Sequence, residues 1–518
     1  MAIGVWISLG LYFALMLAIG FYAYRKSTSS SEEYILGGRQ LHPAVAALSA
    51  GASDMSGWLL LGLPGALFVS GLVSAWIGIG LTLGALLNWI VVAPRLREQT
   101  ERYDNSLTIP EFLANRFPSR AMALRVVSAV IVVVFFSVYT ASGLVAGGKL
   151  AESAFSGVFQ FGGMSDYAAG VSLTLGVVLV YTVIGGFLAV SLTDFCQGVI
   201  MMLALVIMPA VVLFGPGGGG LAQASETLAT VDPHFLSWFA GLSAIGFISA
   251  LAWGLGYFGQ PHIIVRFMAV RSIREVATAR NIGMSWMVIS LIGAVSLGIF
   301  GRAYAVRNGI EVADPETIFI VLADLLFQPL VTGFLFAALL AAVMSTISSQ
   351  LLVASSSLTE DFYRLFLRKK ASEREIVLVG RISVLLVGIV AAFIAWDPGS
   401  RVLGLVSHAW AGFGAAFGPL IILSLMWRRM SGAGAVAGLV VGAMTVIAWI
   451  ALGWDQSFLG GPGVYEIIPG FAAAWIAIYL VSRLTSSSGE YRELPARQAI
   501  GPSRSFRGRA QKNARSSH

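Results

Sequence analysis

The chain has 518 residues, of which 57% are hydrophobic and only 11% are charged. This composition excludes an ordinary soluble domain and predicts an all-α protein that crosses a membrane many times. A single cysteine, Cys196, and five scattered histidines exclude a disulfide framework and a cysteine- or histidine-based metal centre. Nothing in the composition or the motifs indicates an enzyme.

Apolar stretches of about 20 residues, long enough to cross a bilayer, recur along the chain. They predict thirteen spans, at residues 3–24, 43–70, 73–94, 122–153, 167–184, 189–214, 235–264, 277–307, 329–363, 376–396, 402–427, 432–453 and 463–482. The first stretch is too long for the core of a signal peptide, so we expect it to be a retained span. A shorter apolar run, Ile318 to Leu326, predicts a helix outside the membrane.

Basic residues gather in alternate loops. These loops contain, among others, Arg25, Arg39, Arg95, Arg266, Arg271 and Arg364. The opposite loops, at residues 156–166, 216–234 and 308–328, contain no lysine or arginine. The positive-inside rule therefore predicts a multi-pass protein of the cytoplasmic (inner) membrane, with its N-terminus outside and its C-terminus in the cytoplasm. The net charge of +7 comes mostly from the tail, which we expect to lie near anionic membrane lipid rather than to bind nucleic acid.

Two blocks of five spans have opposite orientations, because the first block starts from the cytoplasmic side and the second from the outside. Each block opens with a polar, glycine-containing stretch, Gly51 to Gly57 and Trp253 to Pro261. This pairing is typical of inverted-repeat secondary transporters with broken helices. The predicted units are residues 1–42 (an extra helix and cytoplasmic loop), 43–214 (first repeat), 235–428 (second repeat), 429–484 (two peripheral helices) and 485–518 (a basic, disordered tail).

The stretch Ala50-Gly-Ala-Ser-Asp-Met-Ser-Gly-Trp58 places the carboxylate of Asp54 inside the second span. Small residues allow the backbone to unwind there. The freed carbonyl oxygens suit a hard monovalent cation, and the amide groups suit an anionic substrate. The alternative is a small-residue helix contact in which Asp54 bonds to a neighbour.

In the seventh span, the pattern of Gly254, Gly256 and Gly259 matches a dinucleotide fingerprint, but no strand precedes it, so a nucleotide site is excluded. Trp253 and Tyr257 are four residues apart, which would place both rings on one helical face before Pro261. Such rings suit an apolar substrate with a cationic nitrogen. Ordinary aromatic packing is the alternative.

In the ninth span, Ala342, Ser345 and Thr346 share one helical face, where a carbonyl and two hydroxyls can complete an oxygen shell around a cation. Bonds from the hydroxyls to their own helix are the alternative.

Three further polar positions lie within or near spans. Asp194 near the end of the sixth span could face an ion exit path or cap a helix, and Tyr139 could line a substrate cavity or pack between helices. Lys149 could pair with Glu152 or extend toward the interface.

These blocks resemble the solute:sodium symporter family and, within it, the bacterial members that transport proline. The similar blocks are Tyr34–Arg39, Ala47–Trp58, Gly185–Val190, Trp253–His262, Ala341–Thr346 and Gly404–Pro419. The resemblance extends from about Ile3 to Ser482 and departs at His408, where the family has a tyrosine.

The resemblance implies a LeuT-type core of two inverted five-helix repeats that works by alternating access. It implies sodium-coupled import of L-proline, with Na+ as the coupling ion, no organic cofactor and no obligate protein partner. A symporter for another small solute, such as pantothenate, a betaine or a sugar, remains the alternative.

By position, the resemblance also implies the site residues. Its sodium site falls on the backbone oxygens of Ala52, Met55 and Ala342 and the hydroxyls of Ser345 and Thr346, with Asp54 alongside. Its substrate site falls on Ser56, Gly57, Tyr139, Trp253, Tyr257 and Pro261. Asp194 matches a carboxylate associated with sodium release.

Overall fold

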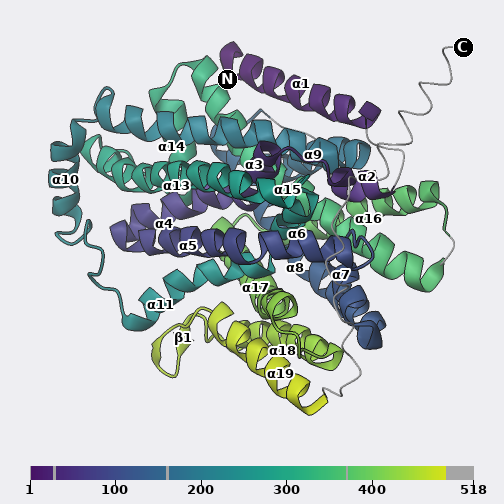
Figure 1. The fold of residues 1–518 in the computed structure, drawn as a ribbon. Helices are drawn as coiled ribbons and strands as arrows, with labels where there is room; N and C mark the ends of the chain where they lie inside the picture. The colour runs from purple at the N-terminus through teal and green to yellow at the C-terminus, as the bar shows by residue number, and fades with distance from the viewer. Residues whose placement is uncertain (1, 27–30, 159–162, 369–370, 486–518) are drawn as a thin grey trace, which may run out of the picture.

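The structure, a computed structural model, describes residues 2–26, 31–158, 163–368 and 371–485, almost all of them helical (Figure 1). The helices are α1 (Ile3–Lys26), α2 (Ser31–Leu36), α3 (Pro43–Asp54), α4 (Leu63–Ser70), α5 (Ala75–Val91), α6 (Ala93–Arg102), α7 (Ile109–Arg116), α8 (Ala121–Ala154), α9 (Asp166–Phe214), α10 (Gly220–Val231), α11 (Ala244–Ala252), α12 (Pro261–Ala269), α13 (Val276–Arg307), α14 (Ile318–Leu326), α15 (Pro329–Ser356), α16 (Glu373–Ile394), α17 (Val402–Met426), α18 (Gly432–Ala451) and α19 (Ile467–Thr485). Short 3₁₀ or π-helical segments are η1 (Gly37–Arg39), η2 (Trp58–Gly62), η3 (Gly71–Ser74), η4 (Pro118–Arg120), η5 (Trp253–Gly259), η6 (Ile273–Glu275), η7 (Pro315–Thr317) and η8 (Ser357–Leu367). Strands β1 (Ser457–Phe458) and β2 (Gly461–Pro462) pair antiparallel. The predicted disordered tail lies outside the described residues.

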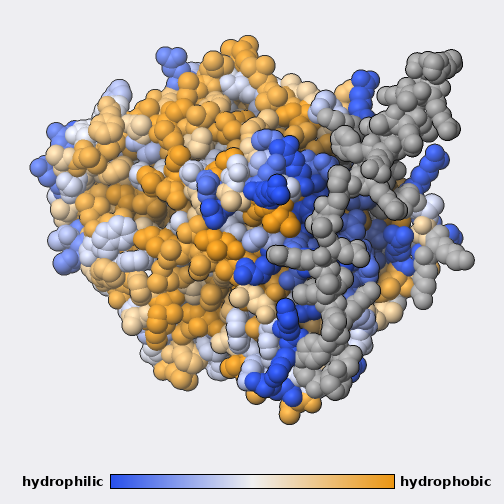
Figure 2. All heavy atoms as spheres, in the orientation of Figure 1, coloured by the Kyte–Doolittle hydropathy of each residue, from blue (hydrophilic) through white to orange (hydrophobic). Residues whose placement is uncertain are grey.

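Ten helical stretches among the described residues are long and apolar enough to cross a membrane, by length and composition. Two shorter apolar stretches, Asp166–Val180 and Ala244–Gly259, lie in the predicted fifth and seventh spans. The chain is thus an all-α multi-pass membrane protein, while the count of thirteen spans stays a prediction because several spans are interrupted. Hydrophobic residues cover most of the face in Figure 2, and hydrophilic residues gather on its right, the end where Figure 1 places α7.

The second predicted span is broken at the predicted position. Helix α3 ends at Asp54, and Met55 then adopts non-helical dihedrals (φ −79°, ψ 76°). The chain re-enters a helical conformation through the π-helical turn η2 and continues into α4. Small residues on both sides of the break weaken the helix, and burial of the segment among neighbouring helices supplies partners for the freed backbone groups.

The seventh span is also broken, since α11 passes into the 3₁₀ segment η5, and α12 begins only at Pro261. Proline suits the first turn of a helix because it has no amide hydrogen to donate. The 3₁₀ geometry makes the prediction of a shared aromatic face wrong. With three residues per turn, positions four apart diverge, and Trp253 stacks on Tyr465 whereas Tyr257 meets the edge of Trp410.

Helix α5 and segment η5 touch backbone to backbone. A Cβ atom on Gly84 would lie 2.1 Å from the Gly254 carbonyl oxygen, so only glycine allows this approach. Helix α9 bends at Gly186, whose φ of +60° also favours glycine, and this bend separates the predicted fifth and sixth spans. The Gly84–Gly254 contact brings the broken segment η5 against α5, and the bend at Gly186 brings α9 against Tyr34 of α2.

The remaining helices surround the two broken segments. Helix α1 packs against α9 and α15, and α18 and α19 pack against α17 at the opposite edge (Figure 1). The short helix predicted outside the membrane is present as α14, with the predicted bounds. The division into two repeats and flanking units stays a prediction.

Arg39 of η1 connects the end of α12 to the loop between α6 and α7. Its guanidinium donates to the Met268 carbonyl at 2.9 Å and to the Ser106 carbonyl at 2.7 Å. Burial lowers the pKa of Arg39 to about 10, so the side chain stays charged at neutral pH.

Candidate functional site

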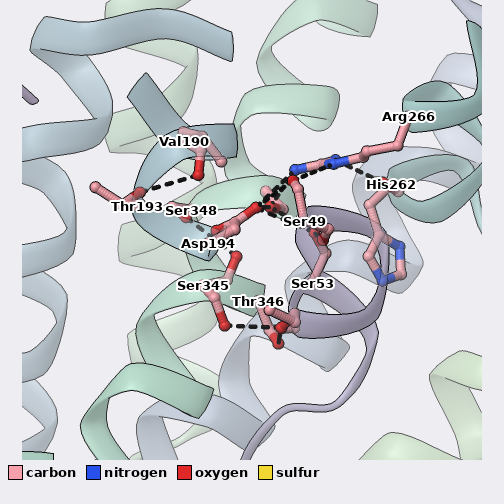
Figure 3. Close-up of polar contacts among 12 residues, drawn as sticks. Ser49, Ser53, Val190, Thr193, Asp194, His262, Arg266, Ser345, Thr346 and Ser348 are labelled. Carbon is pink, nitrogen blue, oxygen red and sulfur yellow. Dashed lines mark hydrogen bonds and ion pairs between the residues drawn. The ribbon is translucent and has the colours of Figure 1, made fainter. Parts of the chain in front are cut away.

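Four oxygen atoms meet where α15 crosses the end of α3. The Ser345 hydroxyl donates to the Ala52 carbonyl at 2.7 Å and lies 3.1 Å from the Ala342 carbonyl. The Thr346 hydroxyl lies 3.4 Å from the Ala52 carbonyl and 3.2 Å from the Ala342 carbonyl. We call these four atoms the oxygen cluster. Figure 3 shows Ser345 and Thr346 converging there, and neutral oxygen ligands of this kind suit a hard cation.

The break in α3 explains why the Ala52 carbonyl is available. In a continuous helix its partner would be the amide of Ser56, but that amide donates instead to the Asp54 carbonyl at 2.9 Å. The Ala52 carbonyl can therefore face α15. Met55, the fifth predicted ligand, lies in the break itself, and the role of its carbonyl stays a prediction.

Asp54 joins three aromatic side chains. Its carboxylate accepts a hydrogen bond from the Tyr257 hydroxyl. Its backbone carbonyl accepts from the Trp58 indole at 3.0 Å and from the Tyr139 hydroxyl at 3.3 Å. The Ser56 hydroxyl is part of the same break, 3.4 Å from the Trp58 amide nitrogen. The structure thus brings together four predicted residues from three separate segments.

The other predicted substrate residues lie apart from Asp54. Trp253 stacks on Tyr465 with ring centroids 5.1 Å apart. Pro261 borders a different cavity, shared with Thr108. Gly57 packs closely on α8, since a Cβ on it would lie 2.8 Å from the Ala146 Cβ. Three of the six predicted substrate residues, Ser56, Tyr139 and Tyr257, therefore lie around the break at Asp54, and the other three each have separate contacts.

Asp194 belongs to a fully buried polar network. Its carboxylate lies 3.3 Å from the Arg266 guanidinium, and neither side chain has exposed surface. Three hydroxyls surround the same carboxylate oxygen, from Ser49 at 2.7 Å and from Ser53 and Ser349 at 3.3 Å each (Figure 3). Because all these contacts are to side chains of other helices, the alternative that Asp194 caps a helix is wrong.

The location of Arg266 also differs from the prediction. The charge pattern placed it in a loop after the seventh span, but it lies inside α12 with no exposed surface. Its guanidinium also donates to the His262 carbonyl and to the hydroxyls of Ser49 and Ser349. A single arginine within the apolar run Ile263 to Ala269 was the available signal.

Two more residues of the site were missed by the sequence reasoning. Trp410 of α17 donates its indole hydrogen to the Trp253 carbonyl at 2.7 Å. Asn88 of α5 donates to the Tyr257 carbonyl at 3.0 Å. Each bond holds a backbone carbonyl of η5, and no local sequence pattern marks a side chain whose partner is a distant broken helix.

Lys149 pairs with η7 rather than with Glu152, which makes that expected pairing wrong. Its ammonium group contacts the Asp314 carboxylate and lies 3.1 Å from the Glu316 carboxylate. Glu316 in turn accepts from the backbone amides of Val402 and Leu403, at 3.0 and 3.1 Å. The Lys149–Glu316 pair therefore connects α8 and η7 to the N-terminus of α17. The Glu316 carboxylate is favourable there because the N-terminal end of a helix carries a partial positive charge.

Sequence comparison relates this chain to known transport proteins. Residues 34–442 match the Sodium:solute symporter family. The chain is 54% identical over 475 residues to a Bacillus subtilis protein named high-affinity proline transporter PutP, covering 92% of this chain and 97% of that protein. It is 50% identical over 498 residues to a Staphylococcus aureus protein named sodium/proline symporter, covering 94% of each.

Among solved structures, a substrate-bound, outward-open Na+-coupled sialic acid symporter has a similar fold. The TM-score is 0.74 at 21% sequence identity, and the match covers 93% of this chain and 98% of that chain. The family match covers most of the chain, and relatives share half of its residues over nearly their whole length. This chain therefore belongs to the sodium:solute symporter family.

Proposed function

We propose that this chain is a sodium-coupled symporter that imports L-proline across the cytoplasmic membrane by alternating access, with its N-terminus outside and its C-terminus in the cytoplasm. The names of its relatives support proline as substrate and sodium as coupling ion. Because these relatives are transporters, we propose transport rather than catalysis.

The oxygen cluster is the observation that carries this proposal. Its atoms come from the broken helix α3 and from α15, so a cation bound there would hold the two elements together. The hydroxyls of Ser345 and Thr346 now donate to carbonyls, and they would turn their lone pairs to the ion when it binds. Sodium binding would thereby fix the conformation of the break that follows Ala52.

The substrate would bind next to this ordered break. The backbone amides around Ser56 and Gly57 would receive the carboxylate of proline, while the aromatic faces of Tyr139 and Tyr257 would face its cationic nitrogen. Trp253 and Pro261 would contact the substrate only after η5 and α12 move relative to α3. Each ligand would then favour the binding of the other, with a coupling free energy of about 1 to 3 kcal/mol.

Uptake of labelled L-proline by proteoliposomes tests the function. An inward sodium gradient should concentrate proline inside the vesicles, and a potassium gradient should not. Ser345→Ala should raise the sodium concentration for half-maximal uptake about tenfold, because the ion loses one ligand. Ser356→Ala is the matched control, since that hydroxyl bonds to the Leu352 carbonyl of its own helix. Uptake that does not depend on sodium would overturn the proposal.

The same vesicles test the substrate. Unlabelled L-proline should compete with the labelled solute, and pantothenate, betaine and sugars should not. If proline is not taken up while another solute of this panel is, the chain is a symporter for that solute instead.

A further inference from the structure

The segment that precedes α19 joins two helices that are far apart in the sequence, α11 and α17. The backbone amide of Tyr465 donates to the Ser249 hydroxyl of α11 at 3.2 Å. The Tyr465 hydroxyl donates to the Ser407 carbonyl of α17 at 3.0 Å. The Oε1 atom of the next residue, Glu466, lies 2.7 Å from Nδ1 of His408, also in α17. We call Tyr465 and Glu466 the clamp.

The clamp is attached to the connection between α18 and α19. The Trp449 indole of α18 donates to the carbonyl of Val464, the residue before the clamp, at 2.9 Å. The Val464 amide donates to the Trp454 carbonyl at 3.0 Å. The Trp449 ring also stacks on Phe458 and meets the edge of Trp454, with centroid distances of 5.0 and 4.8 Å. Aromatic pairs of this kind stabilise the packing around them, so the clamp is anchored in α18 and α19.

The ring of Tyr465 lies against Trp253 of η5. The ring centroids are 5.1 Å apart, the planes differ by 26°, and both residues are 8% exposed. A second bond holds Trp253, since the Trp410 indole of α17 donates to its carbonyl at 2.7 Å. Trp253 is therefore attached to α17 both directly and through the clamp.

In the proposed mechanism, Trp253 contacts proline only after η5 moves relative to α3. Because Tyr465 is attached to α17 and α18, movement of η5 would separate the two stacked rings. Each contact of the clamp thus reduces the fraction of molecules in which Trp253 can reach the substrate, and the apparent affinity falls by that fraction. We propose that Tyr465 and Glu466 are positioning residues that set the affinity for proline through the position of Trp253. This inference rests on the proposed function and gives α18 and α19 a part in substrate binding.

Tyr465→Phe tests the clamp with the smallest change. It keeps the ring that stacks on Trp253 and removes the hydrogen bond to the Ser407 carbonyl. The dissociation constant for labelled L-proline, measured with the purified full-length protein in NaCl, should fall about fivefold, the effect of one hydrogen bond. Tyr304→Phe is the matched control. That tyrosine is also 8% exposed, and its hydroxyl donates to the Pro216 carbonyl at 3.1 Å, outside the clamp.

Glu466→Leu provides a second variant. It removes the contact with His408, whose side chain is 35% exposed and stays hydrated, and it puts an apolar side chain in place of a buried carboxylate. The dissociation constant for L-proline should fall about tenfold, because hydrogen bonds to charged groups are stronger than those between neutral groups.

A double variant separates positioning from a general change in packing. If Tyr465 acts through Trp253, Tyr465→Phe should leave the dissociation constant unchanged in a chain that also carries Trp253→Leu. A merely structural effect would persist in that chain. Amide hydrogen exchange in η5, which needs no substrate, should accelerate in Tyr465→Phe and in Glu466→Leu and stay unchanged in Tyr304→Phe.

Three results would overturn the inference. The first is a dissociation constant that is unchanged or higher in both Tyr465→Phe and Glu466→Leu. The second is an equal effect of Tyr465→Phe with and without Trp253→Leu, and the third is unchanged exchange in η5 in both clamp variants. If the natural chain neither binds L-proline nor takes it up with a sodium gradient, the proposed function fails instead, and exchange in η5 still tests the clamp.

Discussion

Arg266 and Asp194 form an ion pair without exposed surface, and three serine hydroxyls complete their contacts. Taking two charges out of water is unfavourable, so the pair adds little net stability compared with an apolar pair. Loss of only one partner has a much larger effect, because the remaining charge stays buried without compensation.

We therefore expect Arg266→Met to lower the free energy of unfolding by about 3 to 5 kcal/mol. Asp194→Asn combined with Arg266→Met should recover most of this loss, since neither charge remains. Thermal unfolding of the purified variants in detergent measures both effects. Additive losses in the double variant would show that the two side chains do not depend on each other.

Individual site residues were predictable where residue type and local spacing were sufficient. Asp54, Ser345 and Thr346 are polar residues inside apolar spans, and the structure places all three at the break in α3 or beside it. Asn88 and Arg266 were missed because their roles depend on partners far away in the chain. For Arg266, the general excess of arginine in loops suggested the wrong location.

At the scale of elements, the breaks were predictable but their geometry was not. Glycine and small polar residues indicate where a helix is weak. Their positions correctly predicted the break at the end of α3 and the broken segment η5. Whether the chain then forms a 3₁₀ segment or an open turn depends on packing against neighbouring helices. Hence the direction of the Trp253 ring could not be derived from residue spacing.

Lys149 connects a transmembrane helix to the segment that precedes α14. We expect Lys149→Met to loosen η7 by about 1 kcal/mol, because the pair with Asp314 is partly exposed. Amide hydrogen exchange should accelerate at Glu316 and Thr317 and remain unchanged in α16. Glu152→Gln, at an exposed position one turn further along α8, is the control. Equal exchange in the Lys149 variant and the natural chain would contradict the link.

For the whole molecule, hydropathy predicted the helical class and most spans, because each crossing must bury its own backbone hydrogen bonds. The number of crossings was harder to derive from the sequence. The sequence alone does not show whether an apolar region crosses the membrane once or twice. Helix α9 is one long apolar region with a bend, and α11 and η5 together form a shorter apolar region with a break. Orientation relative to the membrane stays a prediction from the positions of the arginines.

Sodium should also stabilise the folded molecule as a whole, because a ligand that binds only the folded state raises its unfolding free energy. At one hundred times the dissociation constant the gain is about 2.7 kcal/mol. We expect a higher unfolding temperature in NaCl than in KCl at equal ionic strength. Ser345→Ala should reduce this difference, and Ser356→Ala should not. Equal unfolding temperatures of the natural chain in both salts would contradict sodium binding.

The contact between Gly84 and Gly254 has a mechanical consequence. Where helices interlock through side chains, sliding requires those side chains to change rotamer and to pass one another. At Gly84 and Gly254 the main chains of α5 and η5 meet directly, and the Asn88 side chain adds one hydrogen bond to the Tyr257 carbonyl across the same contact. A tilt of η5 against α5 therefore needs no rotamer change at the glycines, and the Asn88 hydrogen bond is the side-chain contact that such a tilt must break or carry along.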